Sequence, residues 1–255
     1  MEVGAPAGTR TGARVVARGL ERRFGDHVAL ADIQLEIEPG ESFGLLGANG
    51  AGKTTFIRMV TGFLVPSAGE ITVDGHSPVL EPRAVQERLG FVSESSLLYP
   101  ELSVTRFLRF AGGIRGLAGD ALASAVSQVL ERFDLTSVRD RRIGNLSKGF
   151  QQRVSLAQAF IHQPTLVIAD EPTGGLDPLQ RAYVHKSLAD LRGHQTLLLC
   201  THDLAEARAL TQRVAILFEG RLVALGPTEE ILGDGQSLDL FRGVFASKAP
   251  EAAAP

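Results

Sequence analysis

The sequence predicts an α/β protein with a mixed, mainly parallel sheet, an N-terminal antiparallel β region and an inserted helical subdomain. Three observations support this fold class. Two β-rich runs open the chain, short apolar strands then alternate with helices, and the stretch from about 97 to 162 reads as helices alone. Alternating strands and helices are typical of a parallel sheet covered by helices.

The expected strands are short and are bounded by glycine, proline or polar residues. Runs 13–24 and 29–37 are rich in β-formers, are separated by Gly-Asp-His-Val, and are closed by Pro39-Gly40. The run 42–47, Ser-Phe-Gly-Leu-Leu-Gly, is apolar and bounded by glycines, which suits a buried strand. Further strands are expected at 69–75, 91–94, 166–170, 196–200 and 214–226.

The expected helices alternate with these strands. Residues 53–64 read as a helix that stops near Pro66, and residues 81–90 as a helix with a proline near its start. Further helices are expected at 103–117, 120–135, 150–164, 177–191 and 203–213.

We expect the chain to divide into three segments. Residues 1–12 are small and polar and are expected to be disordered. Residues 13–232 form the main domain, into which the helical subdomain of about 97–162 is inserted. Residues 233–255 are expected to form one short helix and a loose tail rich in alanine and proline.

Composition and charge exclude several classes of protein. With 255 residues, 44% of them apolar and 22% charged, the chain is an ordinary globular protein with enough length for a large core. A net charge of −3 argues against a nucleic-acid partner. The single cysteine, Cys200, excludes an internal disulfide framework and fits a reducing compartment. We expect neither a signal peptide nor a membrane span, since no apolar run approaches the roughly 18–20 residues that a span needs.

A phosphate-binding loop is the first motif that carries chemistry. Residues 47–55 fit the P-loop pattern G-x-x-x-x-G-K-[ST] and lie between an expected strand and an expected helix. Glycines let backbone amides surround phosphate oxygens at a helix N-terminus, Lys53 adds a charge, and the Thr54 hydroxyl can ligate Mg²⁺. The sequence therefore predicts a P-loop nucleotidase core whose nucleotide contacts are Gly47, Ala48, Asn49, Gly50, Ala51, Gly52, Lys53, Thr54 and Thr55.

A dinucleotide site is the alternative for this loop, since Asp74 ends a strand about 20 residues further on. It fails because Thr55 occupies the place of the third glycine in G-x-G-x-x-G. A plain glycine-rich turn is the other alternative, and the strand–loop–helix context argues against it.

Two carboxylates and a histidine follow apolar strands. Asp170 and Glu171 end the run 166–170, and in a parallel sheet that end faces the ligand crevice. Asp170 can then hold Mg²⁺ and Glu171 can act as a general base toward water. His202 follows the next strand and is a candidate to contact the γ-phosphate. The alternatives are a solvated acidic turn and a structural histidine.

These motifs, together with Leu-Ser-Lys-Gly-Phe-Gln-Gln-Arg at 146–153, resemble the ATP-binding cassette of ABC transporters over about residues 14–232. The resemblance makes residues 47–54 the Walker A loop and residues 166–171 the Walker B strand. It implies that ATP and Mg²⁺ are the cofactors, and that Lys53, Glu171 and His202 are the catalytic residues.

The same resemblance assigns further positions. Asp177 lies in the segment that resembles the D-loop, and His202 takes the place of the switch histidine. Phe24 takes the place of the aromatic side chain that stacks on adenine, and a core phenylalanine is the alternative.

The stretch 146–150 matches the family signature L-S-G-G-Q only in part. Leu146, Ser147 and Gly149 match, whereas Lys148 and Phe150 depart from the common form. The resemblance implies that Ser147 and Gly149 bind the ATP of a partner subunit, and the alternative for Ser147 is a helix cap alone.

Glu94 stands where the family usually has glutamine. The resemblance therefore gives Thr54, Asp170 and Glu94 as the metal-side residues, with an exposed loop acid as the alternative for Glu94. An ionised carboxylate can ligate Mg²⁺ but cannot donate a hydrogen bond.

The resemblance implies the ATP-hydrolysing subunit of an exporter, similar to ABC-2-type, drug-efflux and gliding-associated cassettes. It would pair with a second copy of itself or a homologous cassette across two ATP molecules. It would drive a separate integral-membrane permease from the cytoplasmic face of the cell membrane, with no nucleic acid involved. The alternatives are a soluble assembly-factor ATPase of the iron–sulfur scaffold type, a small-molecule kinase with a P-loop, and an inactive regulator, which the presence of Glu171 and His202 argues against.

Overall fold

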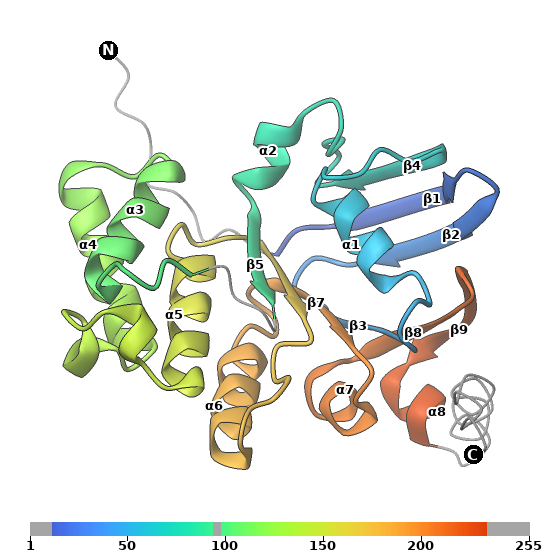
Figure 1. The fold of residues 1–255 in the computed structure, drawn as a ribbon. Coiled ribbons are helices and arrows are strands. Elements are labelled where there is room, and N and C mark those ends of the chain that lie inside the picture. The colour runs from blue at the N-terminus through green and yellow to red at the C-terminus, as the bar shows by residue number, and fades with distance from the viewer. Residues whose placement is uncertain (1–11, 94–97, 234–255) are drawn as a thin grey trace, which may run out of the picture.

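The computed structural model describes residues 12–93 and 98–233, which form two sheets with helices around them (Figure 1). The strands are β1 (Val15–Phe24), β2 (His27–Ile37), β3 (Ser42–Gly47), β4 (Ala68–Val73), β5 (Leu89–Ser93), β6 (Leu166–Asp170), β7 (Thr196–Thr201), β8 (Arg213–Phe218) and β9 (Arg221–Pro227). The helices are α1 (Lys53–Val60), α2 (Pro82–Gln86), α3 (Val104–Ile114), α4 (Gly119–Arg132), α5 (Lys148–Phe160), α6 (Pro178–Ala189), α7 (Leu204–Leu210) and α8 (Thr228–Gly233), with short 3₁₀ turns at Thr136–Val138 and Ile143–Asn145.

The smaller sheet is the expected antiparallel β region. Its order is β2-β1-β4, and both neighbours of β1 run antiparallel to it. Along much of β1 and β2, more buried residues alternate with more exposed ones, so one face of this sheet is directed toward the core. Gly69 of β4 approaches the backbone of Gly19 so closely that a Cβ atom would lie 2.1 Å from the Gly19 carbonyl oxygen. A side chain at position 69 would therefore force these two strands apart.

The larger sheet has the order β5-β6-β7-β3-β8-β9. The first five strands in this order are parallel to one another. In this sheet only β9, which forms a hairpin with β8, is antiparallel. Every residue of β3 and β7 is buried, as expected for central strands of a sheet that is covered on both faces. The predicted fold class, mixed and mainly parallel with an N-terminal antiparallel sheet, is confirmed.

Helices α3, α4 and α5 are inserted between β5 and β6, which are adjacent strands of the larger sheet (Figure 1). Their apolar faces share one core with the sheet, where Phe133 and Phe160 contact each other with ring centroids 5.5 Å apart. Val167 and Ala169 of β6 belong to the same core. The inserted helices thus share one apolar core with the strand that ends at Asp170.

Several sequence-based boundaries were wrong, among them the helix expected at 203–213, which ends at Leu210 because Arg213 already pairs as the start of β8. The helix expected at 81–90 ends at Gln86, because Leu89 and Gly90 pair with β6 as the start of β5. The helix expected at 53–64 ends at Val60, and Gly62 then turns with a positive φ of 78°. The strand expected at 214–226 is a hairpin, since Glu219 and Gly220 both have positive φ, 46° and 77°, and reverse the chain.

The three-segment division stays a prediction. Most of the expected disordered N-terminus, the expected start of the helical subdomain near 97 and most of the expected C-terminal segment lie outside the described residues. Within the described part, α8 adds a helix that the sequence reading had not placed.

The buried aromatic core predicts a large difference between two phenylalanines. Phe133 is 0% exposed and Phe63 is 83% exposed. We expect Phe133→Ala to lower the free energy of unfolding by about 3–5 kcal/mol, because it removes a buried ring and leaves a cavity. Phe63→Ala is the control and should change it by less than about 0.5 kcal/mol. Urea unfolding followed by circular dichroism measures both, and similar losses in the two variants would contradict the packing described here.

Candidate nucleotide-binding site

The predicted phosphate loop lies between β3 and α1, as the motif requires. Each of its three glycines is needed for a different structural reason. A Cβ atom on Gly47 would lie 2.7 Å from the carbonyl oxygen of Leu217, and one on Gly52 would lie 2.6 Å from Leu30. Gly50 has open space around it but a φ of 80°, which L side chains rarely adopt. The loop therefore needs glycine at all three positions before any ligand is considered.

The side chains of the loop differ in exposure. Ala48 and Ala51 are buried, and the Ala51 amide donates to the Ala48 carbonyl at 3.1 Å, which tightens the turn. Asn49, Gly50 and Thr54 are exposed, and Thr55 and Gly52 are half-buried. The exposed tip and the first turn of α1 thus form an open surface at a helix N-terminus, where an anion is favoured.

Lys53 is the buried cation of this surface. Its side chain is 8% exposed, and its Nζ donates to the Gly47 carbonyl at 2.6 Å. The same Nζ lies 4.0 Å from Oε1 of Glu171. A buried ammonium needs partners of this kind, because burying an unpaired charge is costly.

Glu171 is held by donors from the end of the neighbouring strand β7. Its Oε1 lies 2.9 Å from Nδ1 of His202, and its Oε2 accepts from the Thr201 hydroxyl at 3.3 Å. Thr201 was not predicted from the sequence, although its place at the end of the strand that precedes His202 was a usable signal. The structure thus brings Lys53, Glu171 and His202 together.

The backbone of Glu171 is unusual. Its φ is 48°, a left-handed conformation that is uncommon for a residue with a side chain, and its amide donates to the Cys200 carbonyl at 2.8 Å. Cys200 lies beneath this turn and is fully buried. Burial, and then the nearby Asp170 carboxylate, raise the pKa of the Cys200 thiol well above its ordinary value, so this side chain stays a neutral thiol.

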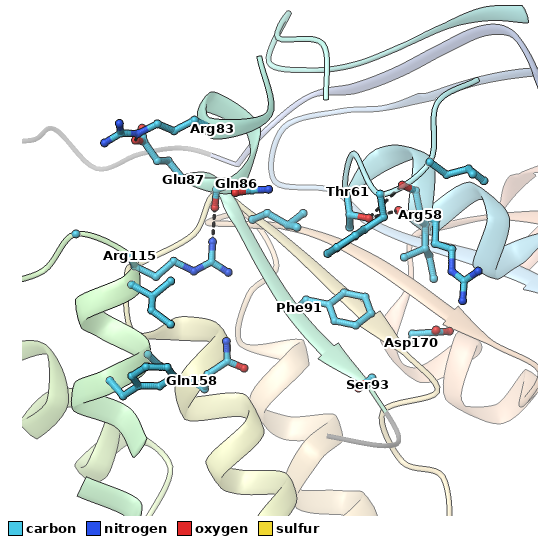
Figure 2. A pocket seen from close by; sticks show the side chains of 18 of the residues that line it. Arg58, Thr61, Arg83, Gln86, Glu87, Phe91, Ser93, Arg115, Gln158 and Asp170 are labelled. Carbon is cyan, nitrogen blue, oxygen red and sulfur yellow. Dashed lines mark hydrogen bonds and ion pairs between the residues drawn. The ribbon is translucent and has the colours of Figure 1, made fainter. Parts of the chain in front are cut away.

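Asp170 and Thr54 line one cavity together with Ser93. The cavity has a volume of about 1240 Å³ and extends from these three residues along β5 toward α2 and α3. Figure 2 shows Ser93 and Asp170 at one end of it, with Phe91 beside them. Two of the expected metal-side residues, Thr54 and Asp170, therefore face a shared space, whereas Glu94 lies outside the described residues.

The donor set suits a magnesium ion that a nucleotide carries. The described residues contain no cluster of three or more His, Cys, Asp or Glu side chains that could hold a metal by themselves. Mg²⁺ usually takes one or two protein oxygens and completes its shell with phosphate and water oxygens. One hydroxyl and one carboxylate at the phosphate loop match that demand.

Ser147 and Gly149 belong to a second group of residues, at the start of α5. Ser147 is the N-cap, and its Oγ accepts from the Phe150 amide at 3.4 Å. A Cβ atom on Gly149 would lie 2.4 Å from the side chain of Gln180 on α6. Asp177 caps α6 and accepts from the Gln180 amide at 2.9 Å. The starts of α5 and α6 are thus packed together, with Ser147 and Asp177 both exposed.

Phe24 is the last residue of β1 and is not a core residue. Its side chain is 46% exposed, and the Arg22 guanidinium lies 4.6 Å from its ring centroid. The alternative of a core phenylalanine is therefore wrong. An exposed aromatic ring can stack on a planar base.

No described helix has the combined length and apolar character needed to traverse a lipid bilayer.

Comparison with known proteins gives the family. Residues 30–174 match the sequence model of the family described as ABC transporter. The chain is 38% identical over 217 residues to the Nod factor export ATP-binding protein I of Cupriavidus metallidurans, which covers 84% of this chain and 71% of the relative. It is 36% identical over 229 residues to the daunorubicin resistance ATP-binding protein DrrA3 of Streptomyces coeruleorubidus, which covers 89% and 72%.

A solved structure described as the ATP-binding subunit of an ABC transporter superposes on the described fold with a TM-score of 0.80. It is 28% identical to this chain and covers 91% of this chain and 99% of that one. The P-loop kinase alternative is therefore wrong. The chain belongs to the ABC transporter family, as an ATP-binding subunit with the ABC-type ATPase fold, and its relatives are export and drug-resistance cassettes.

Proposed function

We propose that this chain hydrolyses ATP with Glu171 as the general base, and that it works as one half of a dimer that drives export through a separate membrane protein. The observation that carries the proposal is the Glu171 carboxylate, held between Lys53 at 4.0 Å and His202 at 2.9 Å. An ATPase of this kind works mostly by positioning and electrostatics, so a fixed carboxylate beside a phosphate-binding lysine is the required arrangement.

Each residue of the nucleotide site has a role in this proposal. Glu171 orients and deprotonates the attacking water, with Thr201 and His202 fixing its two oxygens. Lys53 holds the terminal phosphates, and His202, which is 61% exposed, faces the solvent side of the site, where it contacts the γ-phosphate. Phe24 stacks on the adenine.

Thr54 and Asp170 are the proposed protein ligands of Mg²⁺, with Glu94 as a third metal-side residue. The ion would neutralise charge on the β- and γ-phosphates when it is bound. The support is the shared cavity of Thr54 and Asp170 and the preference of Mg²⁺ for oxygen ligands.

The second half of the site would come from another copy of the chain or from a homologous cassette. Ser147 and Lys148 at the start of α5 are exposed, and the N-terminus of a helix favours a phosphate presented by a partner. The Gln180 side chain occupies the space beside Gly149, so the role of Gly149 is to let α5 and α6 approach each other. Asp177 lies beside this surface as the cap of α6.

Export is proposed from two relatives, a Nod factor export protein and a daunorubicin resistance protein. The membrane partner would dock in the groove formed by the cavity between α1, α2, β5 and α3. Exposed apolar side chains line this groove, namely Phe63, Tyr99, Phe110 and Ile114. An exposed apolar patch of this kind is typical of a protein interface.

The groove also connects the partner to the nucleotide. Its one end is formed by Thr54, Ser93 and Asp170, and its other end by Arg115, whose guanidinium donates to the Gln86 carbonyl across α2 and α3 (Figure 2). Burial lowers the pKa of Arg115, which remains charged at neutral pH because its ordinary value is so high. A helix with apolar and acidic side chains, from a permease at the inner face of the cell membrane, fits this lining.

Glu171→Gln tests the assignment of the base. The amide keeps the size of the side chain and one acceptor oxygen but cannot take a proton, so we expect turnover to fall about 10²- to 10⁴-fold while ATP binding stays within about threefold. Steady-state phosphate release and binding of a fluorescent ATP analogue measure the two quantities. Glu70→Gln, at an exposed carboxylate of β4, is the matched control. Wild-type turnover in Glu171→Gln would disprove the role.

Ser147→Arg tests the partner-facing role of the signature. The larger side chain would occupy the space of the partner's phosphate, so we expect the ATP-dependent dimer in the Glu171→Gln background to be lost. Light scattering with and without ATP reads this out. Ser103→Ala controls for loss of a cap, because Ser103 caps α3 with the same 3.4 Å geometry. A dimer that persists in Ser147→Arg would mean that Ser147 is a cap alone.

Ile114→Asp tests the groove. Ile114 is exposed on α3, so the substitution should leave the fold intact while placing a charge in the apolar lining. We expect capture of a multi-spanning membrane protein in stoichiometric amount by the tagged chain, and at least about tenfold less capture by Ile114→Asp. Mass spectrometry after detergent solubilisation of host membranes measures both. Val223→Asp, on β9, is the control. Equal capture by the wild type and by Ile114→Asp would contradict the groove as the docking site.

A further inference from the structure

We infer that Glu206 is a positioning residue for ATP hydrolysis, which holds the loop that carries the general base. We name residues 171–177 the base loop, since it begins at Glu171 and ends at Asp177. The inference rests on the proposed role of Glu171, and it concerns a side chain on α7 that reaches the base loop through Thr173.

Glu206 is a buried acid with specific partners. It is 1% exposed, and its Oε1 accepts from the Thr173 hydroxyl at 2.8 Å. The same oxygen lies 3.2 Å from Nε2 of His185, which comes from α6. Glutamate is rarely buried so completely, and a carboxylate in the core destabilises the fold unless its hydrogen bonds are made. An apolar side chain would fill the same position with less risk, so the acid has a reason other than packing.

The base loop is anchored at two adjacent residues by two different helices. Gln152 of α5 donates from Nε2 to the Pro172 carbonyl at 2.8 Å, and Glu206 of α7 binds the hydroxyl of Thr173. Two backbone hydrogen bonds inside the loop make it compact. The Gly174 amide donates to the Glu171 carbonyl, and the Leu176 amide donates to the Thr173 carbonyl. A compact loop fixed at residues 172 and 173 transmits its position to the residue directly before them.

That residue is Glu171, whose left-handed backbone is unfavourable unless the surroundings hold it. The anchor from Glu206 also comes from the helix that directly follows His202, since Asp203 caps α7. The same hydrogen bond thus fixes the base loop relative to the segment that carries His202. Loss of this bond would free Glu171 to shift against His202 and the phosphate loop without removing any group that touches the substrate.

The test compares Glu206→Leu with Thr173→Val. Each removes one side of the same hydrogen bond and keeps most of the volume. We expect each to lower kcat for ATP about 10- to 100-fold with KM changed by less than about twofold, because a displacement of about 1 Å at a reacting group has an effect of that size. The double variant should be no slower than the slower single variant, since both single variants break the same bond between Thr173 and Glu206.

Two further variants separate positioning from folding. Glu206→Gln keeps an oxygen that accepts from Thr173, so its kcat should stay within about threefold of wild type. Arg181→Ala breaks a different link between α6 and α7, the ion pair with Asp203, and should leave kcat within about twofold. The melting temperature of each variant is measured in parallel, and Glu206→Leu is expected to lose kcat even where it is no less stable than wild type.

The outcomes are distinguishable from those of the proposed function. If Glu171→Gln abolishes turnover but Glu206→Leu and Thr173→Val hydrolyse ATP at the wild-type rate, the inference about Glu206 is wrong and the base assignment stands. If the losses of kcat in Glu206→Leu and Thr173→Val multiply in the double variant, the shared hydrogen bond is not the cause of the lower kcat and the inference is wrong. If Glu171→Gln itself turns over normally, the proposed function fails first.

Discussion

The parallel pairing of β6, β7 and β3 is the constraint on which the site depends. Asp170 pairs with Cys200 in register, and Leu46 pairs with Thr201. The carboxyl ends of these strands therefore lie at the same edge, and each strand continues there into a loop that carries a polar group. A slip of one residue in either ladder would turn alternate side chains to the opposite face and remove Glu171 or His202 from the group. The register is strongly determined because every residue of β3 and β7 is buried.

The inserted helices depend on the same sheet. They pack on β6 and β7 in one continuous apolar core, rather than forming a core of their own. Helix α5 and strand β6 are in consequence joined by one core, to which Val154 and Phe160 contribute from the helix and Val167 and Ala169 from the strand. A close-packed core transmits small displacements. This shared core gives a physical route between the surface proposed to face a partner and the proposed base.

Polar groups complete that route where the apolar core ends. The buried amide of Gln152 meets the base loop from α5, and the buried Glu206 meets it from α7. Hydrogen bonds of buried groups have a defined direction and are costly to leave unmade, so they fix geometry more sharply than apolar contacts do. The base loop is thus held by two different helices, α5 and α7. The groove proposed for the membrane partner lies next to the same strand ends, near Ser93 and Asp170.

The sequence by itself determined the fold class and most of the elements, because apolar runs bounded by glycine, and the P-loop pattern, are local properties of the chain. It also placed Lys53, Glu171 and His202 at strand or helix ends. Their meeting at one edge followed once the sheet was parallel. Only the tertiary structure decided that Thr201 fixes the second oxygen of Glu171, that Phe24 is exposed, that residues 213–227 form a hairpin, and that Leu89 and Gly90 belong to a strand. Glu206 lies 33 residues from Thr173 and in an ordinary amphipathic helix, so no local pattern marks it. Its role depends on burial and on which helix packs against which loop, and both are set by the assembled sheet rather than by the residues around it in the chain.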